Sequence, residues 1–241
     1  TADAVSPFTP TGIVQARSNY LEHFLEMGGG AERANEVNQA TRAQAKQVLE
    51  KPPASMPGYW DRAADDKRQN PYLFSNVPTI VTGDGDPIQV PLKRSKIDYE
   101  CEMVAVMGAK PARRVPVAQA KDYIFGYAIF NDVTDREGRS EGGSDWLIQK
   151  TLDTFKPWGP YVVPKEFIDP LNIPIKFTLS GRVLQDDNTG SAIHNIYELV
   201  HYSSNLFTLK AGTLVALGTP SGVGTARKPP IYMKPGDTAV C

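Results

Sequence analysis

The chain has 241 residues, 41% of them hydrophobic and 22% charged, a composition typical of a globular protein that excludes a disordered tail or a fibre. With 26 Lys and Arg against 27 Asp and Glu, the net charge of −1 provides no surplus for binding a phosphate backbone. The longest apolar run, residues 123 to 130, is far shorter than the roughly 20 residues of a membrane-spanning helix. We therefore expect neither nucleic acid nor a membrane as a partner.

The first 70 residues predict an N-terminal appendage. Residues 13–26 and 31–50 are rich in Ala, Glu, Gln and Arg and lack proline, so we expect a helix in each. A Pro-rich, charged stretch then leads to a main domain over 71–241. Because the chain opens without Met or a secretory signal, we expect the printed sequence to be trimmed. Two cysteines outside any CxxC motif favour a reducing compartment, and we expect a cytoplasmic protein.

From Tyr72 onward, short β-branched and aromatic segments alternate with turn residues. Helices are expected at 116–121 and 195–207, and the candidate strands are 77–82, 88–92, 99–107, 123–130, 174–180, 182–185 and 213–217. Strands and helices do not alternate regularly, so a Rossmann fold or a TIM barrel is not expected. The pattern predicts a mixed α+β protein, mainly β, with an antiparallel or mixed sheet.

The segment DYECEMVAVMG carries Glu100 and Glu102 at the start of an apolar strand. Side chains two apart on a strand share one face, so these carboxylates are neighbours and resist ionising together unless a cation is bound. A third acid, Asp132, follows the apolar run YIFGYAIF. Three oxygen ligands without Cys or His suit Mg²⁺ or Mn²⁺, with Ca²⁺ as a further option. The alternative is that Glu-x-Glu is the solvated face of an edge strand.

Five motifs in succession resemble those of the fumarylacetoacetate hydrolase family. They are DYECEMVAVMG, DYIFGYAIFNDVTDRE, KTLDTFKPWGP, QDDNT and GTPSGVG, and the similarity spans residues 71–241. The N-terminal segment SNYLEHFLEMG is also similar to a family segment of the form N-Y-x-x-H-x-x-E. The resemblance, closest to the acylpyruvase-like branch, implies a β-roll or β-sandwich catalytic domain with peripheral helices and a homodimer. It also implies one divalent cation held by Glu100, Glu102 and Asp132.

The same resemblance implies a role for the histidine of the N-terminal segment. His23 and Glu26 are three residues apart and share a face if the segment is helical. A lone helical histidine is usually structural, but by resemblance His23 is the general base, on a helix that orders as a lid. Lys150 matches a family lysine that can stabilise oxyanion or enolate charge, and the alternative is a surface lysine.

Four further residues complete the implied site. By resemblance, Arg136 meets a substrate carboxylate, and Arg139 falls where some members have Gln. Thr219, in the GTPSGVG loop, is implied to hydrogen-bond the substrate. Gln185 lies in a segment whose counterpart is near the substrate, although the neighbouring DDNTG is equally natural as a turn. The loop lacks the GK[ST] ending of a P-loop, which argues against nucleotide binding.

Three functions follow, of which the first is favoured. It is a metal-dependent hydrolase that cleaves a carbon–carbon bond in a 2,4-dioxo acid such as an acylpyruvate, fumarylpyruvate or fumarylacetoacetate. Water activated by His23 and Glu26 would attack, and the metal would stabilise the enolate. The second is an oxaloacetate decarboxylase or keto–enol tautomerase. The third is a metal or small-acid binder without turnover, motivated by the departures from the family motifs at Ser75, Asn76 and Gln149.

Overall fold

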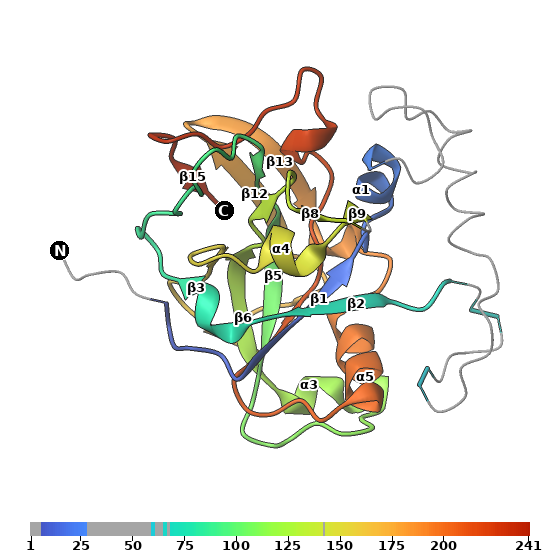
Figure 1. Cartoon of the computed structure of the whole chain (residues 1–241). Helices are drawn as coiled ribbons and strands as arrows, with labels where there is room; N and C mark the ends of the chain where they lie inside the picture. The colour runs from blue at the N-terminus through green and yellow to red at the C-terminus, as the bar shows by residue number, and fades with distance from the viewer. Residues whose placement is uncertain (1–5, 28–58, 61–64, 67, 142) are drawn as a thin grey trace.

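The computed structural model describes residues 6–27, 59–60, 65–66, 68–141 and 143–241, and Figure 1 shows how they are arranged. The described part is a mixed α+β structure built mostly of strands, as the sequence predicts. Its strands are β1 Gly12–Arg17, β2 Tyr72–Asn76, β3 Val81–Thr82, β4 Ile97–Asp98, β5 Cys101–Met107, β6 Ile124–Asn131, β7 Thr134–Asp135, β8 Arg139–Ser140, β9 Gly143–Ser144, β10 Lys156–Pro157, β11 Val163–Pro164, β12 Pro174–Leu179, β13 Arg182–Asn188, β14 Thr213–Ala216 and β15 Ala239–Val240. The α-helices are α1 Leu21–Glu26, α3 Ala120–Tyr123, α4 Trp146–Lys150 and α5 Ile196–Leu206, and the 3₁₀ turns are η2 Pro78–Ile80, η3 Val117–Gln119, η4 Thr189–Ser191 and η5 Gly224–Ala226.

The central sheet has six strands in the order β11-β6-β5-β14-β1-β2. Its N-terminal strand β1 pairs in parallel with β14 and antiparallel with β2. The helix expected over 13–26 is therefore wrong in its first half, because residues 12–17 complete the sheet and only Leu21–Glu26 is helical. Pairing with two distant strands overrides the local helix propensity. The boundary predicted at residue 70 does not coincide with a break in this sheet.

Most other expected elements are present with shifted ends. Strands are found within 99–107, 174–180 and 213–217, the one expected at 123–130 is Ile124–Asn131, and a strand at 182–188 extends the one expected at 182–185. The helix expected at 195–207 is α5, and that at 116–121 is η3 followed by α3. The strand expected at 88–92 is wrong, and 77–82 holds η2 and only a short β3. The helix expected at 31–50 lies outside the described residues.

Strand β5 is buried along its whole length. Cys101, Met103 and Ala105 belong to one apolar cluster, whereas Val104 and Val106 belong to a second cluster on the opposite face. The larger cluster also takes in residues of β12 and α5, and α5 lies beside α3 at one end of the molecule (Figure 1). A strand buried on both faces fits the continuous apolar sequence after Glu102. Within the described residues, no helix is long and apolar enough to cross a membrane.

Candidate active site

The pairing of β5 with β6 brings the three predicted acids together. Cys101 lies opposite Asn131 in the antiparallel ladder, and the backbone N–H of Asp132 donates to the carbonyl of Glu100 at 2.9 Å. Each acid offers an oxygen, and these oxygens all lie within 4.8 Å of one another. Glu100, Glu102 and Asp132 are all buried. We call these three residues the acidic triad.

Two buried lysines neutralise part of the acidic triad. Lys150, at the end of α4, donates to Glu100 Oε2 at 2.9 Å, to Thr134 Oγ1 at 2.9 Å and to Asp132 Oδ2. Lys156 Nζ lies 2.9 Å from Asp132 Oδ1. Burial raises the pKa of Asp132, but the two ammonium groups outweigh burial and hold that pKa below its usual value. Asp132 is therefore an ionised carboxylate at neutral pH.

Glu102 stands apart from the other two acids. It accepts a hydrogen bond from the N–H of Gly218 at 2.9 Å, but no described lysine or arginine forms an ion pair with it. Burial, followed by the charges of Asp132 and Glu100, raises the pKa of Glu102 well above its usual value. A divalent cation among the triad would remove this penalty, and carboxylate oxygens are the ligands that Mg²⁺ and Mn²⁺ prefer. The donor set fits such an ion.

Helix α1 carries a fixed histidine–carboxylate pair. His23 Nδ1 lies 2.8 Å from Glu26 Oε1, and both side chains are largely buried. Glu26 Oε2 in turn accepts from the N–H of Gly222 at 2.8 Å. Because Glu26 is an acceptor, we assign the proton to Nδ1, which leaves Nε2 as an acceptor. The pairing expected from the spacing of these two residues is thus present in the structure.

The GTPSGVG loop uses its backbone N–H groups to hold carboxylates of the protein itself. Gly218 donates to Glu102, Gly222 to Glu26, and Gly224 to Asp98 at 2.7 Å. Gly222 has φ +107°, and a Cβ there would lie 2.2 Å from the Leu184 carbonyl oxygen. Glycine is required at that position because of both the conformation and the close approach. The loop is therefore a clamp for acidic side chains, a role that its sequence did not indicate.

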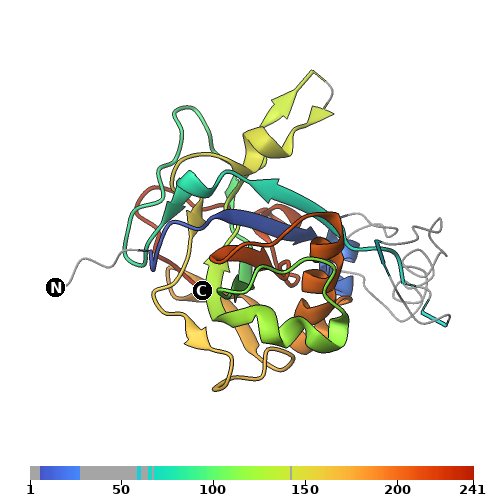
Figure 2. The same ribbon diagram turned by 90° about the horizontal axis from the view of Figure 1, so that it is seen from below.

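A cavity of about 230 Å³ lies against the acidic triad. The sequence-predicted residues that line it are His23, Glu100, Glu102, Asp132, Arg136, Lys150 and Thr219. Gln185 is not among the lining residues, but it donates to Thr219 Oγ1 at 2.8 Å and so sits behind the wall. Arg139 does not line the cavity, because it is exposed on the β8–β9 hairpin, which projects from the body of the molecule (Figure 2). The substrate contacts predicted for these residues stay predictions.

Arg136 is bound on two sides by carboxylates. Its Nε donates to Asp98 at 2.8 Å and its Nη2 to Glu100 at 2.6 Å. Asp98 is fully buried and also accepts from the Gly224 N–H, so Arg136 ties Glu100 to the loop clamp. Sequence reasoning missed both Asp98 and Lys156. Asp98 begins the DYECE motif, but nothing in its spacing marks it as a partner of an arginine.

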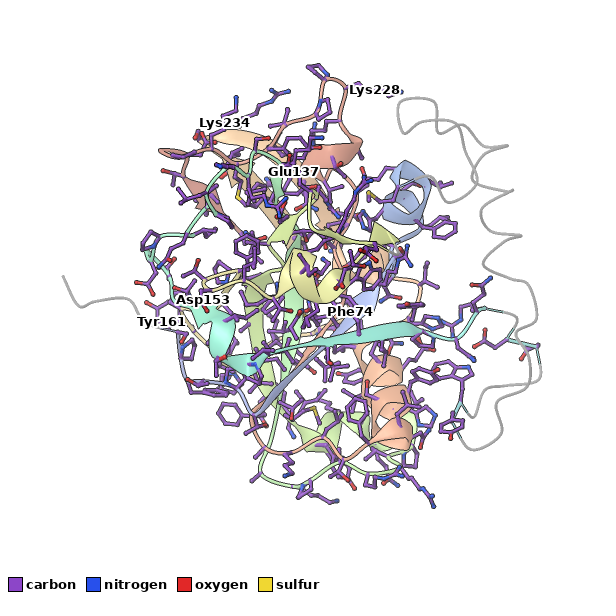
Figure 3. All side chains as sticks on the ribbon, in the orientation of Figure 1. Phe74, Glu137, Asp153, Tyr161, Lys228 and Lys234 are labelled. Carbon is purple, nitrogen blue, oxygen red and sulfur yellow. The ribbon has the colours of Figure 1, made fainter. Side chains whose placement is uncertain are left out.

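Two of the departures from the family motifs, Asn76 and Gln149, and the neighbouring Phe74 have structural partners around α4. Asn76 donates to Gln15 Oε1 and accepts from Thr151 Oγ1 at 2.7 Å, which joins β2 to the end of α4. Gln149 donates to the carbonyl of Gly138 at 2.8 Å. Phe74, labelled in Figure 3, packs its ring edge-on against Trp146 with the centroids 4.8 Å apart. These contacts hold α4, and with it Lys150, against the triad.

Comparison with known proteins gives a consistent result. The family model for the fumarylacetoacetate hydrolase C-terminal domain matches residues 12–241. A fumarylacetoacetate hydrolase domain-containing protein 2 homologue of Dictyostelium discoideum is 41% identical over 72% of this chain and 60% of its own length. A mitochondrial oxaloacetate tautomerase of Xenopus laevis is 35% identical over 72% of this chain and 54% of its own length. The chain thus spans a little over half the length of these relatives.

Solved structures agree with the family match. A 5-carboxymethyl-2-hydroxymuconate delta-isomerase of Mycobacterium smegmatis matches with a TM-score of 0.71 and 30% identity over 98% of this chain and 75% of the other. A fumarylacetoacetate hydrolase of Exiguobacterium antarcticum matches with a TM-score of 0.74 and 26% identity, covering 98% of this chain and 72% of the other. The chain belongs to the fumarylacetoacetate hydrolase family.

Proposed function

We propose that the protein catalyses keto–enol exchange of a 2-oxo acid of the oxaloacetate type, with Mg²⁺ or Mn²⁺ held by Glu100, Glu102 and Asp132. The observation that carries the proposal is that His23, fixed by Glu26 at 2.8 Å, lines the same cavity as the acidic triad. Relatives at about a third identity are named oxaloacetate tautomerases, which favours this reaction over the others of the family. These relatives are named as mitochondrial proteins. A cytoplasmic location and a homodimer stay predictions for this chain.

In this reaction His23 moves the proton. The C3–H bond of the substrate breaks toward Nε2, its electron pair forms the C2–C3 double bond, and the 2-oxo oxygen takes up the negative charge. A bound divalent cation supplies Lewis acidity at the 2-oxo acid end. Glu26 stabilises the imidazolium that forms, and return of the proton to oxygen gives the enol.

Three further predicted residues, Lys150, Arg136 and Thr219, contact the acidic triad or border the cavity. All three N–H bonds of Lys150 are directed at Glu100, Asp132 and Thr134, so Lys150 positions the ligands. Arg136 holds Glu100 from the other side. Thr219 donates to the Cys101 carbonyl at 2.9 Å and borders the cavity. The role first predicted for Lys150, stabilising substrate charge directly, stays a prediction.

Hydrolysis of a 2,4-dioxo acid is the second candidate. The same His23–Glu26 pair is arranged to take a proton from water as well as from carbon, and the triad would stabilise the departing enolate through its cation. Decarboxylation needs no attacking water and belongs with the first candidate. The products separate the three reactions: enol alone, carbon dioxide, or a carboxylic acid fragment.

The test follows oxaloacetate enol absorbance and, in parallel, hydrolysis of an acylpyruvate panel, each with Mg²⁺ or Mn²⁺. We expect tautomerisation by the wild type and a loss of about 10²- to 10⁴-fold in kcat for His23→Gln. Glu166→Gln, at an exposed position, is the control and should retain activity. Product analysis showing only acid fragments would replace the first candidate with the second. Unchanged rates in His23→Gln would remove His23 from both.

A further inference from the structure

Arg17 lies where two cavities meet. It is the last residue of β1, it is exposed, and it lines the cavity of the acidic triad. A second cavity of about 340 Å³ shares Ala16, Arg17, Ser18 and Met27 with the first. Ser18 has φ +50°, a left-handed conformation that is costly for serine and turns the chain sharply after Arg17. The arginine therefore stands at the border between the triad and the second cavity.

Aromatic rings hold this arginine in place. The guanidinium carbon of Arg17 lies 4.7 Å from the Trp146 ring centroid and 5.4 Å from that of Tyr72. The two rings also contact each other, with centroids 5.4 Å apart. A cation over aromatic faces is attracted by the ring quadrupole, and this attraction uses none of its N–H donors. The guanidinium is oriented by the rings, and its N–H donors form no hydrogen bond to the part of the chain that the structure describes.

The other two cations of the cavity wall, Arg136 and Lys150, are paired with carboxylates of the protein. Arg136 pairs with Asp98 and Glu100, and Lys150 pairs with Glu100 and Asp132. Among the described residues, none forms an ion pair with Arg17. The cavity therefore presents one cation whose charge is not matched by a described carboxylate. A negatively charged ligand group is what such an arginine fits.

We propose that Arg17 binds the second, distal carboxylate of the substrate and so selects 2-oxo dicarboxylates over monocarboxylates. This rests on the proposed function, which places the 2-oxo acid end at the acidic triad. The planar fork of arginine matches a carboxylate with two parallel hydrogen bonds, which lysine does not reproduce. Charge-assisted hydrogen bonds of this kind correspond to about 10- to 100-fold in affinity.

The experiment compares oxaloacetate with its 4-methyl ester, in which a methyl group removes the distal charge. For Arg17→Gln we expect KM for oxaloacetate to rise about 10- to 100-fold with kcat little changed, and KM for the ester to stay the same. Arg17→Lys should recover part of the loss. Arg182→Gln, on an exposed position of β13, is the matched control and should leave both substrates unaffected.

A binding measurement separates this inference from the proposed function. Calorimetry on the metal-loaded protein uses malate and its 4-methyl ester, which do not enolise. If the wild type turns over neither substrate but prefers malate through Arg17, the proposed function fails and the Arg17 inference holds. If oxaloacetate is turned over but Arg17→Gln affects diacid and ester equally in both experiments, the inference is overturned and the function stands.

Discussion

The two walls of the triad cavity are built on opposite principles. The inner wall, which we define as Glu100, Asp132 and Lys150, is buried and its charges are bonded to one another. The rim, Arg17 with Tyr72 and Trp146, is held by aromatic contacts and leaves its cation without a described carboxylate. The ion pairs of the inner wall hold the carboxylate oxygens of Glu100 and Asp132 in place. The rim is open to a ligand, which makes it the region where specificity is set.

This difference comes from the elements that supply each wall. The inner wall is fixed by adjacent strands of one sheet, where Asp132 N–H bonds the Glu100 carbonyl at 2.9 Å and α4 adds Lys150. The rim instead joins the ends of β1 and β2 to the first residue of α4. Backbone pairing fixes positions more tightly than contacts between exposed side chains. Substitutions should therefore affect stability at the inner wall and substrate choice at the rim.

The largest effect is expected at the inner wall, from Lys150→Met. The substitution removes the shared cation of Glu100 and Asp132, which are buried, and keeps only Arg136 beside Glu100 and Lys156 beside Asp132. Losing three charge-assisted hydrogen bonds and part of the charge balance of this buried cluster costs about 3–5 kcal/mol in unfolding free energy. Urea unfolding in the presence of a chelator measures this loss without help from a bound metal. Lys210→Met, at an exposed position, is the control and should change little. A loss of unfolding free energy below about 1 kcal/mol would contradict the description of the inner wall as a buried cluster whose charges pair with one another.

The parts of this wall that the sequence predicts are those set by local geometry. Glu100 and Glu102 share a face because strand side chains alternate, and Asp132 follows an apolar run long enough to be the neighbouring strand. The ion pair between Lys156 and Asp132 has no such signal, because Lys156 lies on another segment, after β6 and α4. The ion pair between Arg136 and Asp98 has no local sequence signal either, because the two residues lie on different segments. Contacts between elements depend on packing that no short motif encodes.

The fold, too, is predictable only where local sequence determines it. Strand β5 is predictable because its residues are apolar on both faces, whereas β1 was expected to be helical. The partners of β1 are β2 and β14, and β14 lies about 200 residues along the chain, with Gly12 opposite Thr213. Local composition carries no information about such a pairing. The composition of 13–26 therefore predicts a helix at Arg17, where the structure has the end of β1 at the mouth of the cavity.

A smaller effect is expected when metal is added or removed. With metal at a hundredfold excess over its Kd, the free energy of unfolding should rise by about 2.7 kcal/mol, measured by urea unfolding with Mg²⁺ or Mn²⁺ against a chelator. Glu102→Gln should abolish most of this gain. In the chelator it should be at least as stable as wild type, because burial and two neighbouring acids already disfavour its charge.

The control for this measurement is Glu166→Gln, an exposed position, which should keep the full gain from metal. If Glu102→Gln gains as much stability from metal as wild type, Glu102 is not a ligand. That result would separate Glu102 from Glu100 and Asp132, whose carboxylates are already paired with lysines.

The smallest effect is expected at the rim, from Trp146→Leu. The change removes the nearer of the two rings that hold Arg17, at 4.7 Å, and leaves Tyr72 at 5.4 Å. An exposed cation–π contact contributes about 0.5–1 kcal/mol, so KM for a dicarboxylate should rise about 2- to 5-fold. Trp146→Phe keeps an aromatic face and should fall between Trp146→Leu and wild type. The methyl ester should be unaffected in both variants, since it has no distal charge for Arg17 to bind. An equal rise for ester and diacid would mean instead that Trp146 acts through α4 and Lys150, on the inner wall.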